Sequence, residues 1–381
     1  YMGINVGAFI CNFVAAYMQI NYGWGYAFAA AGVGMLIGLV IFALGTKHIR
    51  EADVIKPLQP GDMSTSLVMK TVLLPSLVFG VLGYLIPGNL LGTDTNDAFI
   101  FGCLPVVAFF IYLYVKANEV DKRPIGALLA VFGCIVIFWA VFHQNGDALT
   151  VWAKDHTDRE MADGISKVAD RLGMAQTVTN NGATTDANSA EYFASMAPER
   201  VPAEGQSLKL YSTQLYQSIN PFWVVLLTPV IVGFWGFMRS RRKEPSTPSK
   251  IAIGLIITAL SALVMVGAVM ATNNLESKAS SWWLIASYGV ITVGELCLSP
   301  MGLSLVSKLS PSRITALMMG GFFLSTALGN KLSGMLSGLW EGFENKANFF
   351  YMNFALAMVA AVMLLLLLRW LNAIMREKNI H

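Results

Sequence analysis

The sequence predicts an all-α integral membrane protein, and three observations carry this prediction. Of the 381 residues, 55% are hydrophobic and only 13% are charged, whereas a typical soluble domain carries about 25% charged residues. The mean hydropathy is +0.57. The apolar residues lie in long continuous runs, without the alternating pattern of a membrane barrel. A soluble globular domain is therefore excluded, and the net charge of +3 is too small to indicate a nucleic-acid partner.

Ten apolar runs are long enough to cross a bilayer as helices, since a span needs roughly 20 apolar residues. Helices are expected because lipid offers no hydrogen-bond partners to exposed backbone groups. The ten predicted spans lie at about 1–19, 23–46, 71–88, 98–117, 124–144, 219–239, 250–272, 282–307, 314–339 and 347–370.

The distribution of basic residues predicts the orientation of these spans. Lys and Arg gather in every second short loop and in the C-terminal tail, whereas the alternate short loops hold almost none. We therefore expect the basic loops and the C-terminus to be cytoplasmic. The basic residues concerned are Lys47, Arg50, Lys56, Lys70, Lys116, Lys122, Arg123, Arg239, Arg241, Arg242, Lys243, Lys250, Lys308, Arg313, Arg369, Arg376 and Lys378.

One long polar loop, at about 153–217, falls on the other side of the membrane. Long segments cross regardless of their charge, so this placement does not conflict with the orientation. Residues 155–175 show weak helical periodicity, and 177–190 have the composition of a loop or disordered segment. We interpret the loop as an accessory insertion without chemistry of its own.

Glu295 is the polar residue that is least expected in an apolar span. An ionised carboxylate at this depth is costly unless it is paired or hydrated, so its protonation should respond to its neighbours. Ser299 lies one helical turn further along the same face, and Pro300 frees backbone carbonyls in the next turn. These residues indicate either a water-accessible, proton-coupling site or a structural ion pair beside a hinge.

Four other residues also stand out. Asn5 either joins two helices or faces a polar cavity. Trp139 near the end of a span is typical of the interfacial aromatic belt, and His143 is either solvated at the interface or a proton relay. Asn220, directly before a proline, is interpreted from its position as the cap of a helix.

Five segments, taken in order, resemble the proton-dependent oligopeptide transporter family, a branch of the major facilitator superfamily. The first resembles the family's FYxxINxGSL signature and the fourth its ExCxSPxGL segment. The segments are Tyr1-Met-Gly-Ile-Asn-Val-Gly-Ala-Phe, Phe138-Trp-Ala-Val-Phe-His-Gln-Asn-Gly, Gln217-Ser-Ile-Asn-Pro, Gly294-Glu-Leu-Cys-Leu-Ser-Pro-Met-Gly-Leu and Met318-Met-Gly-Gly-Phe-Phe-Leu-Ser-Thr-Ala-Leu-Gly-Asn.

The resemblance implies two six-helix bundles joined by an inserted helical hairpin. Residues 1–46 would be helices five and six of the N-terminal bundle, and 47–123 a cytoplasmic linker with the inserted transmembrane hairpin. Residues 124–381 would be the whole C-terminal bundle, with the polar loop at about 153–217. On this reading the first four helices, which carry the family's ExxERFxYY motif, are not in the sequence.

The resemblance also implies a peptide site. Glu295 would bind the peptide amino terminus and couple protons. The substrate-binding residues would be Tyr1, Asn5, Trp139, Asn220, Glu295, Ser299 and Phe322. Members of the family often carry Trp in place of Phe322 and an acid in place of His143, which leaves His143 as a possible relay.

The activity implied by the resemblance is proton-coupled import of di- and tripeptides by alternating access, in a bacterial inner membrane. Protons are the coupling ion, and no cofactor or metal is expected. One alternative is a related transporter of another solute, such as nitrate, a modified amino acid or a peptide-like drug. A membrane enzyme or receptor is the other alternative, although the sequence shows no clustered set of His, Cys and Asp residues.

Overall fold

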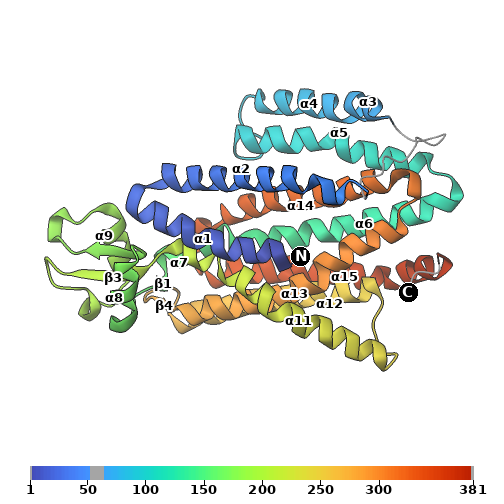
Figure 1. The fold of residues 1–381 in the computed structure, drawn as a ribbon. Helices are drawn as coiled ribbons and strands as arrows, with labels where there is room; N and C mark the ends of the chain where they lie inside the picture. The colour runs from blue at the N-terminus through green and yellow to red at the C-terminus, as the bar shows by residue number, and fades with distance from the viewer. Residues whose placement is uncertain (1, 52–63, 379–381) are drawn as a thin grey trace.

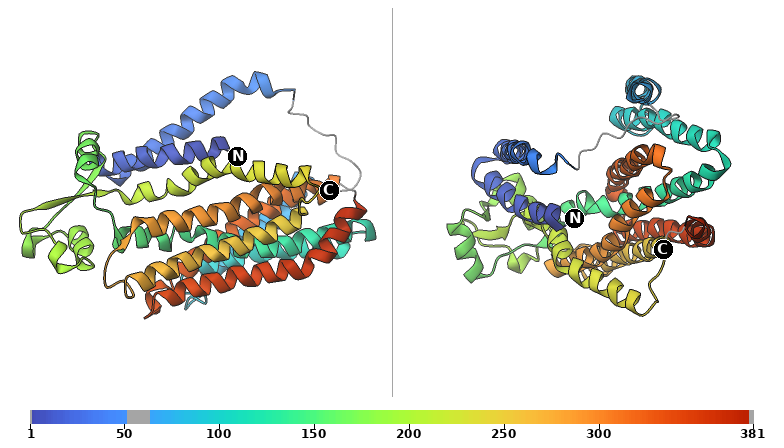
Figure 2. Two further views of the ribbon diagram at one scale, coloured as in Figure 1. Left: turned by 90° about the horizontal axis from the view of Figure 1, so that it is seen from below. Right: turned by 45° about the vertical axis from the view of Figure 1, so that its right-hand side comes forward.

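Long helices make up most of the computed structural model, which describes residues 2–51 and 64–378 (Figure 1). Most of them run roughly along one axis, as the left-hand view of Figure 2 also shows. The long helices are α1 (Met2–Tyr22), α2 (Trp24–Ile49), α4 (Leu74–Tyr84), α5 (Asp94–Lys116), α6 (Glu119–Phe142), α11 (Ile219–Ser240), α12 (Thr247–Ala271), α13 (Ser281–Leu309), α14 (Thr315–Ser337) and α15 (Ala347–Glu377). The short helix α3 (Thr65–Val68) and a π-helical turn (Met69–Leu73) lead into α4.

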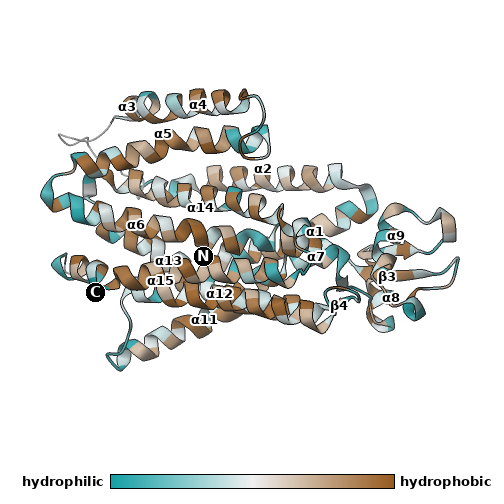
Figure 3. Ribbon diagram, turned by 180° about the vertical axis from the view of Figure 1, so that it is seen from behind, coloured by the Kyte–Doolittle hydropathy of each residue, from teal (hydrophilic) through white to brown (hydrophobic). Residues whose placement is uncertain are grey.

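Nine helical segments in the described part of the chain are long and apolar enough to cross a membrane. They coincide with nine of the ten predicted spans. The tenth prediction, 314–339, does form a helix, α14, but α14 is not among the nine. Its Gly and Ser residues, together with Asn330 and Lys331, lower its hydropathy. Figure 3 colours the ribbon by hydropathy, with apolar residues along the long helices and polar residues towards their ends.

The main apolar core lies where α6, α12, α13, α14 and α15 meet. Helix α12 packs between α13 and α15, and α6 packs against α14 and α15. Van der Waals packing between such helices holds them together in a membrane. Almost fully buried members of this core are Ile125, Leu128, Ile135, Leu255, Leu298 and Leu364.

Two helical hairpins flank this core, and α5 adds Phe109, Phe110 and Leu113 to it. Helix α1 packs on α2 and on α11, and α4 packs on α5 at the upper edge of Figure 1. Large apolar side chains of α2, such as Met35 and Leu36, are exposed along the helix. Lipid is as apolar as these side chains, so their exposure is expected of a membrane helix.

A small polar subdomain, residues 157–212, projects from one end of the bundle (Figure 1, left). Its elements are β1 (Thr157–Asp158), α8 (Asp163–Arg171), β2 (Ala175–Thr179), α9 (Ala187–Ala194) and β3 (Ser207–Tyr211). Strands β2 and β3 pair antiparallel, from Ala175 opposite Tyr211 to Thr179 opposite Ser207. A separate core of Val178, Tyr192, Met196 and Leu210 lies under them.

The subdomain is joined to the bundle by short elements. Helices α7 (Ala148–Asp155) and α10 (Thr213–Tyr216) flank it in the chain. Strand β1 pairs in parallel with β4 (Ala279–Ser280), which directly precedes α13.

The prediction that 177–190 form a loop or disordered segment is wrong. The stretch contains most of β2, a turn of 3-10 helix (Gly182–Thr184) and the start of α9. The composition of the stretch is polar. Its buried residue Val178 packs with Met196 and Leu210, which lie outside the stretch, and its strand β2 pairs with β3. Such distant pairing leaves no local hydrophobic pattern.

Candidate functional site

Helix α13 places Glu295 at its centre, and the carboxylate side chain is only 6% exposed. The helix continues through Pro300 without ending. Beside Glu295, α13 crosses α12 very closely, because a Cβ on Gly294 would lie 2.7 Å from the carbonyl oxygen of Gly254. A side chain on Gly294 would therefore force the two helices apart.

Asn220, in the first turn of α11, reaches Glu295. Its amide Nδ2 donates to Oε2 of Glu295 at 3.0 Å and to Oγ1 of Thr292 at 2.8 Å. Oγ1 of Thr292 in turn donates to the carbonyl oxygen of Tyr288 at 2.7 Å. Asn220, Thr292 and Glu295 thus form an intramembrane polar cluster that links α11 to α13.

The interpretation of Asn220 as a helix cap is wrong. The N-cap of α11 is Ser218, and its hydroxyl makes no capping bond. That hydroxyl instead donates to the carbonyl oxygen of Phe9 on α1, at 3.0 Å. The start of α11 is therefore tied to α1 through Ser218 and to α13 through Asn220.

Ser299 and Asn5 lie close to this region. Ser299 is buried one turn after Glu295, and its Oγ has no hydrogen-bond partner in the described structure. Asn5 is also buried, one turn before Phe9 on α1. Because the ring of Phe9 lies 6.2 Å from that of Phe222, this face of α1 packs on α11. Tyr1 lies outside the described residues, as do 52–63 of the expected linker.

Trp139 and His143 form a second group at the end of α6. Their rings stack with centroids 5.0 Å apart at an interplanar angle of 21°. Helix α14 approaches Trp139 closely at Gly329, where a Cβ would collide with that residue and lie 2.8 Å from the carbonyl oxygen of Val136. Nε1 of Trp139 and Nε2 of His143 have no hydrogen-bond partner in the described structure.

Phe322 packs inside the main core, with its ring edge-on to Phe132 at 6.3 Å. The structure thus brings Asn220 and Glu295 into direct contact. It places Trp139 on α6, His143 in the turn that directly follows α6, and Phe322 on α14.

Sequence reasoning missed Thr292, which lies three residues before Glu295 and so on the same helix face. A search for polar residues at helical spacing around Glu295 would have found it. The reasoning also missed Arg159, which is only 2% exposed although it lies in the polar subdomain. Its sequence neighbourhood is polar and gives no signal of burial.

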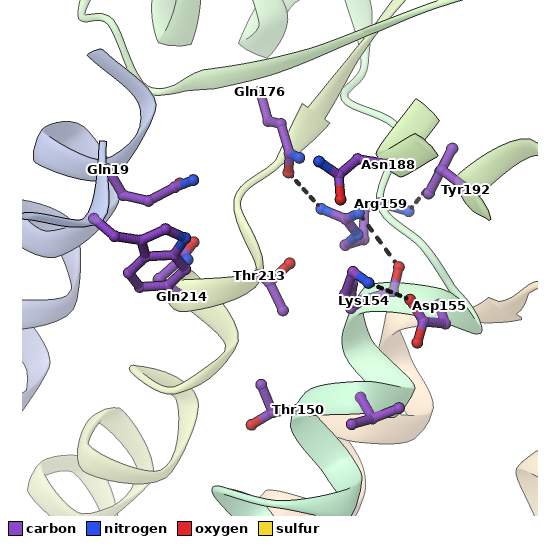
Figure 4. Close-up of a pocket in the computed structure, with 12 residues that line it drawn as sticks. Gln19, Thr150, Lys154, Asp155, Arg159, Gln176, Asn188, Tyr192, Thr213 and Gln214 are labelled. Carbon is purple, nitrogen blue, oxygen red and sulfur yellow. Dashed lines mark hydrogen bonds and ion pairs between the residues drawn. The ribbon is translucent and has the colours of Figure 1, made fainter. Parts of the chain in front are cut away.

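Arg159 lines a cavity of about 280 Å³ between the polar subdomain, α7 and the α1–α2 hairpin (Figure 4). Its Nη1 donates to Oε1 of Gln176 at 2.9 Å and to the carbonyl oxygen of Tyr211 at 2.8 Å. Its guanidinium lies 5.2 Å from the ring centroid of Tyr192, and the Lys278 ammonium lies 4.0 Å from the same ring. Burial lowers the pKa of the Arg159 guanidinium.

Three curated bacterial proteins are similar to this chain. They are the "Uncharacterized transporter YclF" of Bacillus subtilis (28% identical, covering 90% of the chain), the "Peptide transporter YePEPT" of Yersinia enterocolitica (27%, 89%) and "Dipeptide and tripeptide permease A" of Proteus mirabilis (28%, 91%). The chain spans 60% of the length of each.

A solved structure has the same fold. The crystal structure of a glutamate-to-glutamine mutant of the peptide transporter POT matches with a TM-score of 0.68 and 25% identity, over 98% of this chain and 67% of that one. The fold is therefore that of the major facilitator superfamily, in a multi-pass membrane protein whose relatives are transporters and not enzymes. A model described as the POT family matches residues 1–178 and 200–353, most of the sequence, and the chain belongs to that family.

Proposed function

We propose that this chain belongs to a proton-coupled symporter that imports di- and tripeptides by alternating access. The observation that carries the proposal is the hydrogen bond from Asn220 to Glu295, between two long apolar helices. The names of the Yersinia and Proteus relatives support peptides as the substrate class. Protons are the proposed coupling ion, without a further cofactor.

The chemistry follows from the cost of a charge in lipid. A carboxylate among apolar helices is stable only while polar groups compensate it. Protonation of Glu295 would remove the charge that its Asn220 contact stabilises and so loosen α11 from α13. The ammonium group of a peptide would compete with the same amide for the carboxylate oxygen. Proton and peptide would then each favour a different arrangement of the two helices, as coupled transport requires.

The remaining site roles belong to the same proposal. Asn5 and Ser299 would complete the polar surface near Glu295, and Trp139 and Phe322 would wall pockets for peptide side chains. His143 would act as a relay. The proposal includes Tyr1 as a substrate contact.

The proposed architecture keeps the expected division of the chain. Residues 1–46 are assigned to the N-terminal bundle, 47–123 to the linker with its hairpin, and 124–381 to the C-terminal bundle. The C-terminus is placed in the cytoplasm of a bacterial cell, with the protein in the inner membrane.

Uptake into liposomes tests the proposal. The full-length protein carrying Glu295→Gln should lose proton-driven accumulation of a labelled dipeptide. Glu276→Gln is the matched control, because Glu276 is an exposed acid in the loop before α13. Unchanged uphill uptake by Glu295→Gln would contradict the proposal. Failure of unlabelled dialanine to compete would instead indicate a different solute.

A further inference from the structure

A second, larger cavity lies at the opposite end of the bundle from the polar subdomain. Its volume is about 890 Å³, and it opens where α11, α13 and α15 end and α12 begins. The distribution of basic residues predicts this end to be cytoplasmic. The lining residues are Arg239, Glu244, Pro245, Ser246, Thr247, Ser249, Lys250, Met301, Ser304, Lys308, Asn372, Met375 and Arg376.

The wall of this basic cavity carries four cations and one carboxylate. Glu244 already pairs with two of the cations: Arg239 donates to it at 2.6 Å and Lys250 at 2.5 Å. Lys308 and Arg376 are exposed, and neither forms an ion pair with any described residue. The cavity therefore has a surplus of positive charge that its own walls do not neutralise.

Glu244 is held in both of these ion pairs and stays ionised. Lys250 is only 5% exposed, and its ammonium lies 4.9 Å from the ring centroid of Trp235. The hydrogen bond from Arg239 is the main reason that the pKa of Glu244 falls to about 2. At neutral pH, protonation of Glu244 therefore cannot change the charge of the cavity.

The first turn of α12 adds partial positive charge to the same wall. Its N-cap is Ser246, whose hydroxyl contacts Oγ of Ser249 at 2.8 Å and makes no capping bond to the backbone. Pro248 in this turn has no N–H, but the other N–H groups of a first helical turn have no partner within the helix and attract anions together with the helix dipole. In a helix of 25 residues this contribution is fully developed.

We infer that the basic cavity binds a phosphate-bearing anionic group. Unpaired Lys308 and Arg376 and the open end of α12 favour a multivalent anion over a neutral ligand. Basic pockets between the cytoplasmic ends of transmembrane helices are typical binding sites for anionic lipid headgroups. The same chemistry would accept free phosphate, and the experiment separates the two sources. The site is independent of the transport proposal, because no residue of the intramembrane polar cluster lines it.

The test uses the full-length protein in phosphatidylcholine nanodiscs, with thermal unfolding as the readout. Phosphatidylglycerol is added in increasing mole fraction in one series, and inorganic phosphate is titrated in another. The variant is Lys308→Gln with Arg376→Gln. The control is Lys243→Gln with Arg369→Gln, which removes two exposed charges that do not line the cavity.

We expect at least one ligand to raise the unfolding temperature of the wild type and of the control. The cavity variant should need roughly 30-fold more ligand for the same shift, from about 1 kcal/mol per basic residue. A response to phosphatidylglycerol alone identifies a lipid headgroup, and an equal response to inorganic phosphate identifies the free anion. No response to either ligand would overturn the inference, as would equal losses in the variant and the control.

Discussion

Two nearly fully buried charged side chains, Glu295 and Arg159, differ in what their hydrogen bonds connect. The amide of Asn220 joins Glu295 on α13 to a separate long helix, α11. Arg159 is held inside the polar subdomain and its attachment to α7, by Gln176 and by the carbonyl oxygens of Tyr211 and Lys154. Both charges therefore make hydrogen bonds to neutral groups, and the contact of Asn220 with Glu295 joins two long membrane helices.

This difference indicates two kinds of role. A buried charge strongly destabilises a protein when a partner is lost, so each contact has a large effect on its surroundings. Movement of α11 against α13 would change the environment of Glu295, as a coupling group requires. Arg159 ties β2, β3 and the end of α7 together, so we expect it to stabilise structure without taking part in transport.

The largest expected effect on stability is at Arg159. Arg159→Met should lower the free energy of unfolding of the polar subdomain by about 3 kcal/mol, because the half-buried oxygens of Gln176 and Tyr211 lose their donor. Protease cleavage within 157–212 reports this loss. Arg171→Met, an exposed arginine on α8, is the control and should resist cleavage like the wild type. Equal resistance of both variants to cleavage would contradict the stabilising role of Arg159 in the polar subdomain.

The next effect is at Asn220. Asn220→Leu should lower the free energy of unfolding by about 2 kcal/mol, because the buried carboxylate of Glu295 loses a donor. It should also abolish uphill dipeptide uptake. Thr292→Val should cost only about 1 kcal/mol, since it removes an acceptor of Asn220 and a bond within α13. Normal uptake by Asn220→Leu would show that the cluster is structural, like the contacts of Arg159.

The same two regions differ in how far the sequence predicts them. The membrane helices follow from hydropathy, because burial in lipid acts on every residue of a span. The contact of Asn220 with Glu295 joins residues 75 positions apart and depends on how α11 packs on α13, which no local pattern encodes. Only the resemblance to a family brought these two residues together before the structure did.

The polar subdomain was less predictable still. Its strands β2 and β3 are separated by about 30 residues of polar sequence, and each is too short to show a clear alternation. In the sequence, Arg159 resembles a solvated loop arginine. The groups that bind it, Gln176 and the backbone of Tyr211, lie 17 and 52 residues away, so no local pattern indicates its burial.

A pH-dependent effect is expected where the subdomain meets the bundle. Burial lowers the pKa of His156 from 6.5 to about 4, and the nearby cations Lys278 and Lys346 contribute. Between these values the unfolded chain binds a proton that the folded chain does not. The free energy of unfolding should therefore fall as the pH drops from about 6.5 towards 4, and His156 should have no effect above that range.

Thermal unfolding against pH measures this dependence. His156→Gln should flatten the acid limb of the curve, because Gln does not titrate. His48→Gln replaces an exposed histidine on α2 and should leave the curve as in the wild type. If the acid limb survives in His156→Gln, a different group destabilises the protein at low pH.

The smallest effect concerns the attachment of the polar subdomain to α1. Nδ2 of Asn21 donates to the carbonyl oxygens of Tyr17 and Gly173, each at 2.8 Å, and only the second bond reaches the subdomain. Asn21→Ala should therefore speed hydrogen exchange around Gly173 by about fivefold, equivalent to ~1 kcal/mol for one exposed hydrogen bond. Asn12→Ala is the matched control, because Asn12 makes only the bond within the helix, to Ala8. Unchanged exchange in Asn21→Ala would mean that the subdomain is held by its own elements and by α7. Faster exchange would instead show that α1 restrains it, so that movement of α1 against α11 in transport would be transmitted to the subdomain.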